Sequence, residues 1–352
     1  MSSEQLSSSS KAVSLWLFVM IIMVVSMVLL GGATRLTNAG LSITEWRPVS
    51  GALPPLSDAA WASEFGKYQQ IPEFSAEHPD MDLAGFKFIY FMEWSHRQLG
   101  RLIGLVYFVP LVLFLRNKKI PSGKRGRFIA ILLLIGVQGA IGWWMVASGL
   151  VHGRVDVSQY RLAVHLGTAF FILALLLWTW LDNRQNWPKR PPVAKLQKRT
   201  MVLFILVFLQ ILAGALVAGT HAGAYYPTWP HMDGGFMPDG YLSSSPIWVS
   251  VFEDRGTIQF NHRMLGYAVF LMAIWVWVSA WQTENMILRR ALSLLLLAIC
   301  GQIALGVITL LYVVPLKLAL VHQAGAILVF MLAAWTLRTT RYGAIEERPQ
   351  AD

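Results

Sequence analysis

The sequence predicts an all-α integral membrane protein: eight transmembrane helices in two parallel-repeat four-helix bundles, with both termini cytoplasmic. Three observations support this fold class. The composition is 55% hydrophobic and only 14% charged, with a mean hydropathy of +0.52, far from the range of soluble domains. Windows of about 20 residues with almost no charge recur along the chain. The first half of the chain also resembles the second half, motif by motif.

Each expected span is an apolar window long enough to cross a hydrocarbon core of about 30 Å. The sequence predicts spans at residues 12–33, 88–115, 128–150, 162–181, 200–219, 258–281, 291–314 and 318–337. A basic segment that contains proline separates the fourth span from the fifth. We therefore expect an N-terminal bundle over residues 1–181, a cytoplasmic linker over 182–199 and a C-terminal bundle over 200–352.

The distribution of Lys and Arg orients these spans. Of the 29 basic residues, 18 fall in the two tails and the even-numbered loops, and eight fall on the opposite side. Positive loops stay in the cytoplasm, so both termini should lie there. The net charge of +10 therefore reflects topology and contact with the lipid bilayer, and we expect no nucleic acid partner. The N-terminal tail has neither the Arg content of a transit peptide nor a cleavage site, which favours a multi-pass protein of a bacterial inner (cell) membrane.

An internal repeat organises the chain. EWSHRQLGRLIGL at 93–105 matches QFNHRMLGYAVFL at 259–271, and IGVQGAIG at 135–142 resembles ICGQIALG at 299–306. YRLAVHLGTAFFIL at 160–173 likewise resembles LKLALVHQAGAILVF at 316–330. Since each repeat contains an even number of spans, the two bundles should be parallel repeats related by an axis along the membrane normal.

Four of the eight histidines occupy equivalent places in this repeat. His96 and His262 lie in the second helix of each half, and His165 and His322 lie in the fourth. All four should sit on the order of 10 Å inside the outer boundary, because a helix rises about 1.5 Å per residue. Two imidazoles that converge at one depth are what a six-coordinate heme iron requires. A purely structural role is the alternative for one intramembrane histidine, but four in a duplicated pattern favour heme.

Charged and small residues accompany these histidines. Arg97, Arg101 and Arg263 lie within about a turn of a predicted ligand, where a guanidinium group can pair with a heme propionate. Glycines beside the histidines would let a flat macrocycle approach the backbone. The chain has one cysteine, Cys300, so it can form neither an internal disulfide nor a cysteine-based metal site.

An ordered set of motifs resembles the heme A synthase family over residues 31–337. The motifs are GGATRLTNAGLSITEWRPVSGALPP, EFGKYQQIPEF, EWSHRQLGR, VHLGTAFF, NHRMLGY and VHQAGA. The resemblance is to the branch shared by alphaproteobacteria and mitochondria, which lacks paired outer-loop cysteines. It implies oxidation of the ring D methyl of heme O to a formyl group by successive hydroxylation, giving heme A for cytochrome oxidase. It also implies a resident heme B in one half, the substrate heme O in the other, and a functional link to the farnesyltransferase that makes heme O. The electron acceptor and the state of homo-oligomerisation stay open.

One difference between the repeats assigns the two hemes. Position 93 is Glu, whereas its equivalent 259 is Gln, which cannot take a proton at working pH. We therefore expect the substrate heme in the first half, on His96 and His165, with Glu93 as the catalytic carboxylate, and heme B on His262 and His322. The alternative for Glu93 is a helix-surface ion pair with Arg97 at i,i+4.

Two other classes of protein compete with this interpretation. A di-heme b-type transmembrane electron-transfer protein would hold a permanent heme at each histidine pair. A transporter built from parallel repeats would need helices broken at mid-membrane, and the glycines here lie elsewhere. The long first outer loop, residues 34–87, favours an enzyme. Its segment 58–64 should form a short helix, and the loop should either cover the substrate site or anchor the protein at the interface.

Overall fold

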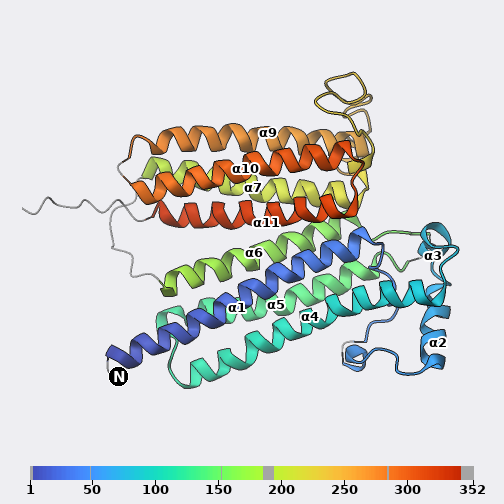
Figure 1. Cartoon of the computed structure of the whole chain (residues 1–352), viewed down its shortest axis with the longest axis horizontal. Coiled ribbons are helices and arrows are strands. Elements are labelled where there is room, and N and C mark those ends of the chain that lie inside the picture. Colours follow the sequence, from blue (N-terminus) through green and yellow to red (C-terminus); the bar gives the residue numbers. More distant parts are fainter. Residues whose placement is uncertain (1–2, 48, 152, 185–193, 284, 342–352) are drawn as a thin grey trace, which may run out of the picture. The chain divides into compact units, whose positions relative to one another are not determined.

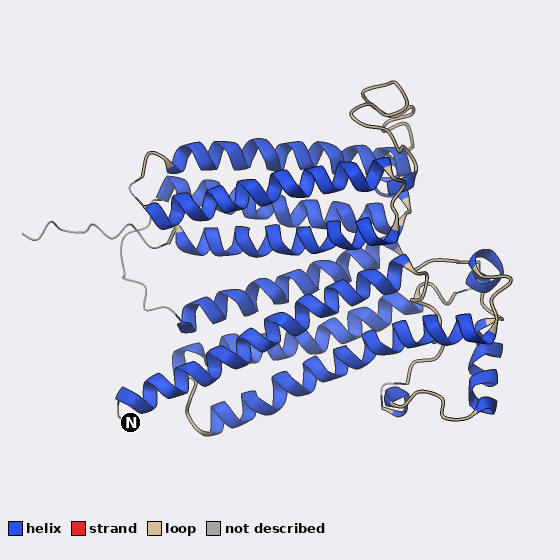
Figure 2. Ribbon diagram, viewed as in Figure 1, coloured by secondary structure: helices blue, strands red, loops and turns tan. Residues whose placement is uncertain are grey.

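The structure is a computed structural model that describes residues 3–47, 49–151, 153–184, 194–283 and 285–341. Within these residues, eight helices are long and apolar enough to span a membrane, which confirms the predicted all-α membrane protein with eight spans. The eight are α1 (Ser3–Leu36), α4 (Leu83–Arg116), α5 (Arg125–Ala147), α6 (Gln159–Arg184), α7 (Ala194–Gly219), α9 (Arg255–Ala280), α10 (Met286–Leu311) and α11 (Leu316–Thr339). Figure 2 shows only helices and loops in the described part of the chain.

The chain divides into two compact units by its internal contacts. The first holds residues up to 176 together with 218–220, and the second holds residues 177–217 and those from 221 onward. In the first unit α4 packs against α1 and α5, and in the second α10 packs against α9 and α11 (Figure 1). The expected bundle boundaries, the parallel repeat and the cytoplasmic termini stay predictions. Residues 185–193 of the expected linker and 342–352 of the C-terminal tail lie outside the described residues.

Aromatic side chains fill the centre of each unit. In the first unit the Trp16 ring stacks on Phe128, and its indole nitrogen donates to the Val106 carbonyl over 2.8 Å. In the second unit the buried Phe330 packs against Phe204 and Phe208. Because lipid gives helices no hydrophobic reason to associate, such shape-matched contacts hold a membrane bundle together.

Two helices end three residues earlier than the sequence predicts. The predicted span 128–150 stops at Ala147 because Ser148 Oγ turns back to the Met145 carbonyl over 2.6 Å and accepts from the Ser158 amide over 2.8 Å. The predicted span 291–314 stops at Leu311 because Val313 and Val314 adopt φ values of 58° and 56°. This left-handed conformation ends a helix.

Among its described residues, the loop between α1 and α4 contains two short α-helices, α2 (Asp58–Tyr68) and α3 (Pro72–Glu77). The predicted helix at 58–64 is therefore present, and it extends one turn further. Its N-cap is Ser57, whose hydroxyl accepts from the Ala60 amide over 3.2 Å. A hydrophobic cluster, called here the outer cap, joins the loop to the first turns of α4. Its buried members are Ala39, Ile43, Trp61, Tyr68, Phe86, Ile89 and Tyr90.

The corresponding loop of the second unit lies between α7 and α9. It contains a single α-helix among the described residues, α8 (Ile247–Glu253), directly before α9. Asp254 caps α9 by accepting from the Thr257 amide over 2.7 Å, as Asp82 caps α4 by accepting from Gly85 over 2.8 Å. These caps fix the points at which α4 and α9, two of the four histidine-bearing helices, begin.

Candidate functional site

Each unit contains two of the four repeat histidines. His96 and His165 lie on α4 and α6, and His262 and His322 lie on α9 and α11. His165 lies near enough to His96 to act on it electrostatically, and His322 lies as near to His262. All four side chains are partly exposed although they lie within membrane spans. The structure therefore brings the predicted ligands together as two pairs.

A glycine on the adjacent helix faces each histidine. A methyl group placed on Gly142 or Gly306 would lie 2.9 Å from Cε1 of His165 or His322, and one on Gly214 would lie 3.2 Å from Cε1 of His262. The fourth contact is between α1 and α4, where a methyl group on Gly31 would lie 2.9 Å from Nε2 of His96. Any side chain at these positions would push the ring aside, so the glycines set the space in which the imidazoles lie.

A glutamine one turn before the glycine contacts three of these histidines. Gln138 Nε2 donates to the carbonyl of His165 over 2.9 Å, and Gln302 Nε2 donates to that of His322 over 2.8 Å. Gln210 Nε2 donates to the carbonyl of the third, His262, over 3.0 Å. Each bond ties the neighbouring helix to the histidine-bearing helix at the histidine itself, which restrains that residue.

These surroundings fit a heme. The Nδ1 atoms of His165, His262 and His322 are buried and have no hydrogen-bond partner, so each ring has a nitrogen that the protein leaves unused. Buried polar atoms are normally paired, and exceptions often mark sites for a bound group. Neutral imidazole nitrogens are also the usual axial ligands of heme iron. Three of the four histidines therefore have an unused nitrogen, and all four are the residue type that heme iron takes as a ligand.

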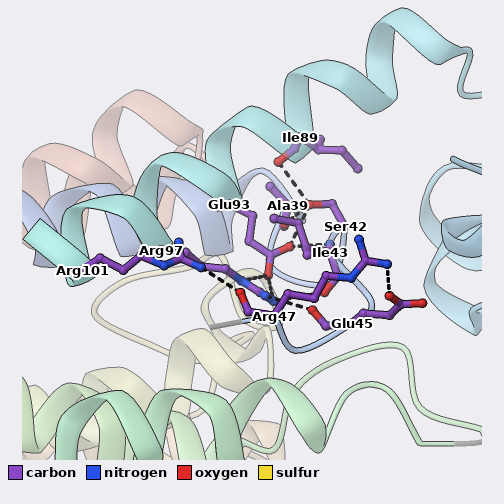
Figure 3. Close-up of polar contacts among 9 residues, drawn as sticks. All are labelled: Ala39, Ser42, Ile43, Glu45, Arg47, Ile89, Glu93, Arg97 and Arg101. Carbon is purple, nitrogen blue, oxygen red and sulfur yellow. Dashed lines mark hydrogen bonds and ion pairs between the residues drawn. The ribbon is translucent and has the colours of Figure 1, made fainter. Parts of the chain in front are cut away.

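Glu93 lies one turn before His96 and is buried, with 3% of its surface exposed. Its Oε2 accepts from Ser42 Oγ and from the Ile43 amide, each over 2.8 Å, and its Oε1 accepts from Arg97 Nη2 over 2.6 Å (Figure 3). Arg97 also donates to the Ile43 carbonyl over 3.0 Å. The ion pair weighed against a catalytic role is therefore present, and the same carboxylate anchors the outer loop to α4.

The second unit makes the corresponding contact with the opposite polarity. Gln259 Nε2 donates to the carbonyls of Gly223 and Tyr226 over 3.2 and 3.3 Å, and Arg263 Nη2 donates to the Tyr226 carbonyl over 2.9 Å. The amide thus donates to its loop, whereas the Glu93 carboxylate accepts from its own. Glutamine can anchor a loop in this way without carrying charge, so anchoring alone does not require the acid at position 93.

A pocket of about 410 Å³ lies beside Glu93, at the outer end of the first unit. Arg97 and Arg101 contribute to its wall, and Arg101 donates to the Gln98 side chain over 2.5 Å and to the Arg47 carbonyl over 3.1 Å. The first unit therefore presents a guanidinium group where an anionic substituent can approach.

Charged side chains of the outer loop surround the same pocket. Lys67 Nζ bridges Glu45 and Glu64 over 2.9 Å each, and Arg47 pairs with both carboxylates. The hydrogen bond from Lys67 holds the pKa of Glu45 below its ordinary value, and the bonds to Glu45 and Glu64 raise the pKa of Lys67. This network fixes α2 over the segment that Glu93 anchors.

A further carboxyl group, Glu73 on α3, is buried within the same outer region with 4% of its surface exposed. Its Oε2 has no hydrogen-bond partner. Burial raises the pKa of Glu73 to about 8, and the nearby charge of Glu93 adds to the shift. Glu73 therefore titrates close to neutral pH.

Sequence reasoning missed the residues that hold the predicted site residues in place. Ser42 and Ile43 lie about 50 residues before Glu93, and neither belongs to a recognisable motif beside it. The glutamines did leave a signal, since Gln138 and Gln302 occur at the same place in the repeated segments IGVQGAIG and ICGQIALG. Comparing those segments with QILAG at 210–214 of α7 would have added the third glutamine, Gln210.

Comparison with known proteins places this site in context. Residues 14–334 match the family described as cytochrome oxidase assembly protein. The chain is 50% identical over 340 residues to the heme A synthase of Maricaulis maris, an alignment that covers 94% of this chain and 98% of that protein. It is 47% identical over 336 residues to the heme A synthase of Paracoccus denitrificans, with 94% and 88% covered. For the heme A synthase of Parvibaculum lavamentivorans the identity is 44%, with 94% and 95% covered.

Proposed function

Because the chain belongs to the cytochrome oxidase assembly protein family, we propose that it is a heme A synthase, an enzyme that acts on heme O in the bacterial inner membrane. Its eight apolar helices suit a multi-pass protein of that membrane. The proposed reaction is oxidation of the ring D methyl of heme O to a formyl group by successive hydroxylation. One observation supports an enzyme above all: the two histidine sites match closely, but only the first has a carboxylate one turn from a ligand.

We assign the substrate to the first unit. His96 and His165 would bind the iron of heme O and so orient the substrate. Glu93 lies one turn from His96 and would accept a proton as the methyl group is oxidised. Ser42 and the Ile43 amide keep this carboxylate in place, and Arg101 would pair with a propionate. The outer loop closes over this end of α4, where it would limit the access of water.

We assign heme B to the second unit, where His262 and His322 would hold it. When bound, heme B supplies electron transfer. Gln210 and Gln302 would restrain both ligands from the neighbouring helices, and Arg263 would pair with a propionate if it leaves the Tyr226 carbonyl. A site with both ligands restrained suits a group that stays bound.

The heme O synthase, the farnesyltransferase that makes this substrate, would be the functional partner. Its product is too apolar to cross water freely, so a transfer within the membrane is the direct route. Co-purification of the two proteins from the same membrane, with and without crosslinking, tests the link. The same preparation also shows whether the chain forms homo-oligomers.

Pigment analysis of purified variants tests the assignment of the two hemes. His262→Leu or His322→Leu should abolish the low-spin spectrum of heme B. His96→Leu or His165→Leu should stop heme A formation while heme B stays bound. Loss of heme B from the His96 and His165 variants would mean that the two units are reversed. Two molecules of heme B in the wild-type protein, with no heme O or heme A, would favour a di-heme electron carrier instead.

A further inference from the structure

Three of the four histidine sites share a glutamine that the fourth lacks. In three of them, the residue four before the facing glycine is a glutamine, within the segments QGAIG, QILAG and QIALG. In the site of His96, the equivalent segment is MVLLG, and the residue in the glutamine position is Met27. The glutamine is therefore replaced by methionine only in the first unit, and there only at the site of His96.

Met27 occupies the same place in space as its counterpart. A methyl group on Gly266, one turn after His262, would lie 3.4 Å from Nε2 of Gln210. A methyl group on Gly100, one turn after His96, would lie 3.4 Å from Cε of Met27. The thioether therefore lies where the amide lies in the other unit, in contact with the helix that bears the histidine.

The chemical consequence of this exchange is direct. A glutamine amide has two donor hydrogens, whereas the methionine thioether has none and accepts only weakly. In the other three sites a glutamine donates a hydrogen bond to the carbonyl of the histidine. Met27 cannot donate such a bond to His96. Methionine is also unbranched and flexible, so it yields when a neighbouring ring moves. His96 also differs in the ring atom that lies nearest to the facing glycine. That atom is Nε2 in His96 and Cε1 in the other three histidines.

We propose that Met27 makes His96 the exchangeable axial ligand of the substrate heme. The proposal rests on the function proposed above, in which heme O enters the first unit and heme A leaves it. A substrate that must depart needs one ligand that can leave its iron, whereas a resident heme needs none. His165, restrained by Gln138, would keep its bond while His96 leaves and rejoins. Ligand exchange of this kind breaks and forms one iron–nitrogen bond and requires no oxidant.

Heme release from the purified full-length protein tests the proposal. Excess apomyoglobin captures heme as it leaves, and absorbance follows the transfer. Met27→Gln installs the missing donor and should slow release of heme O and heme A about threefold to tenfold, the effect of one neutral hydrogen bond. Met27→Leu preserves size without a donor and should release heme at the wild-type rate. Low-spin signals in electron paramagnetic resonance should show that both variants retain two histidine ligands.

The reciprocal variant tests the same principle in the second unit. Gln302→Met removes the donor from His322 and should speed the release of heme B by a similar factor. If Met27→Gln holds its hemes but releases them at the wild-type rate, the proposal is wrong. If Met27→Gln fails to fold, the Gln302→Met variant decides. Release of heme B from Gln302→Met at the wild-type rate would then overturn the proposal. If the heme that Met27→Gln retains is heme B, the glutamine acts as described but the substrate does not bind in the first unit.

Discussion

Replacing Glu93 with Gln tests the most specific residue assignment made for this protein. The amide oxygen of the variant can still accept from Ser42 and from the Ile43 amide. Its NH₂ group, however, must face the Arg97 guanidinium, so that a donor meets a donor. The variant therefore removes a charge and disturbs the anchor of the outer loop together, and the two effects need separate measurements.

The structure sets the expected size of each effect. Removing one partner of a buried ion pair costs about 3–5 kcal/mol. Arg97 keeps its bond to the Ile43 carbonyl, so we expect the lower end, about 3 kcal/mol, for opening of the anchored loop segment. Amide exchange at Ile43 should then be roughly 100-fold faster. Heme extracts from the same cells should contain heme O or a hydroxylated product in place of heme A, with heme B still bound.

Ser42→Ala is the matched control for this experiment. It removes one donor to the carboxylate and leaves the charge, so amide exchange at Ile43 should rise by about tenfold while heme A is still made. Wild-type amounts of heme A from Glu93→Gln would show that the carboxylate only anchors the loop. Equal loss of heme A from both variants would refute proton acceptance as the role of Glu93, because anchoring alone would then account for it.

Three other changes test further parts of the structure. Gly306→Ala places a methyl group 2.9 Å from His322 Cε1 and should lower heme B content, whereas Gly301→Ala on the same helix meets open space and should retain it, as pigment extraction will show. Burial raises the pKa of Glu73 from 4.5 to about 8, so the folded protein holds this proton more tightly than the unfolded protein. The free energy of unfolding should therefore fall by about 1.4 kcal/mol per pH unit as the pH rises from the unfolded pKa to the folded pKa. Glu73→Gln should remove that slope in thermal unfolding followed from pH 5 to 9. Ser57→Ala should cost α2 about 1 kcal/mol, seen as faster amide exchange in its first turn.

The fold could be read from the sequence because the membrane imposes long charge-poor windows. Helix ends were less predictable: Val313 and Val314 are apolar, and nothing in their composition reveals the left-handed turn that ends α10. The histidine pairs were predictable because each histidine of the first half has an equivalent histidine in the second half. Ser42 was not, since its partnership with Glu93 depends on how a loop folds back over 51 residues. Met27 was also missed, because a methionine is an ordinary residue in an apolar span. It stands out only after the other three histidine sites are seen to have a glutamine at the equivalent position.

The length of α4 has a mechanical consequence. With 34 residues it is about 51 Å long, well beyond a hydrocarbon core of about 30 Å. Its first turns contribute Phe86, Ile89 and Tyr90 to the outer cap, and the same rod carries His96 before the helix reaches its one proline, Pro110. The helix is therefore continuous, without a proline, from the outer cap to His96. A load applied to the cap, by a docking protein or an antibody, would therefore reach His96 as a tilt of the whole helix.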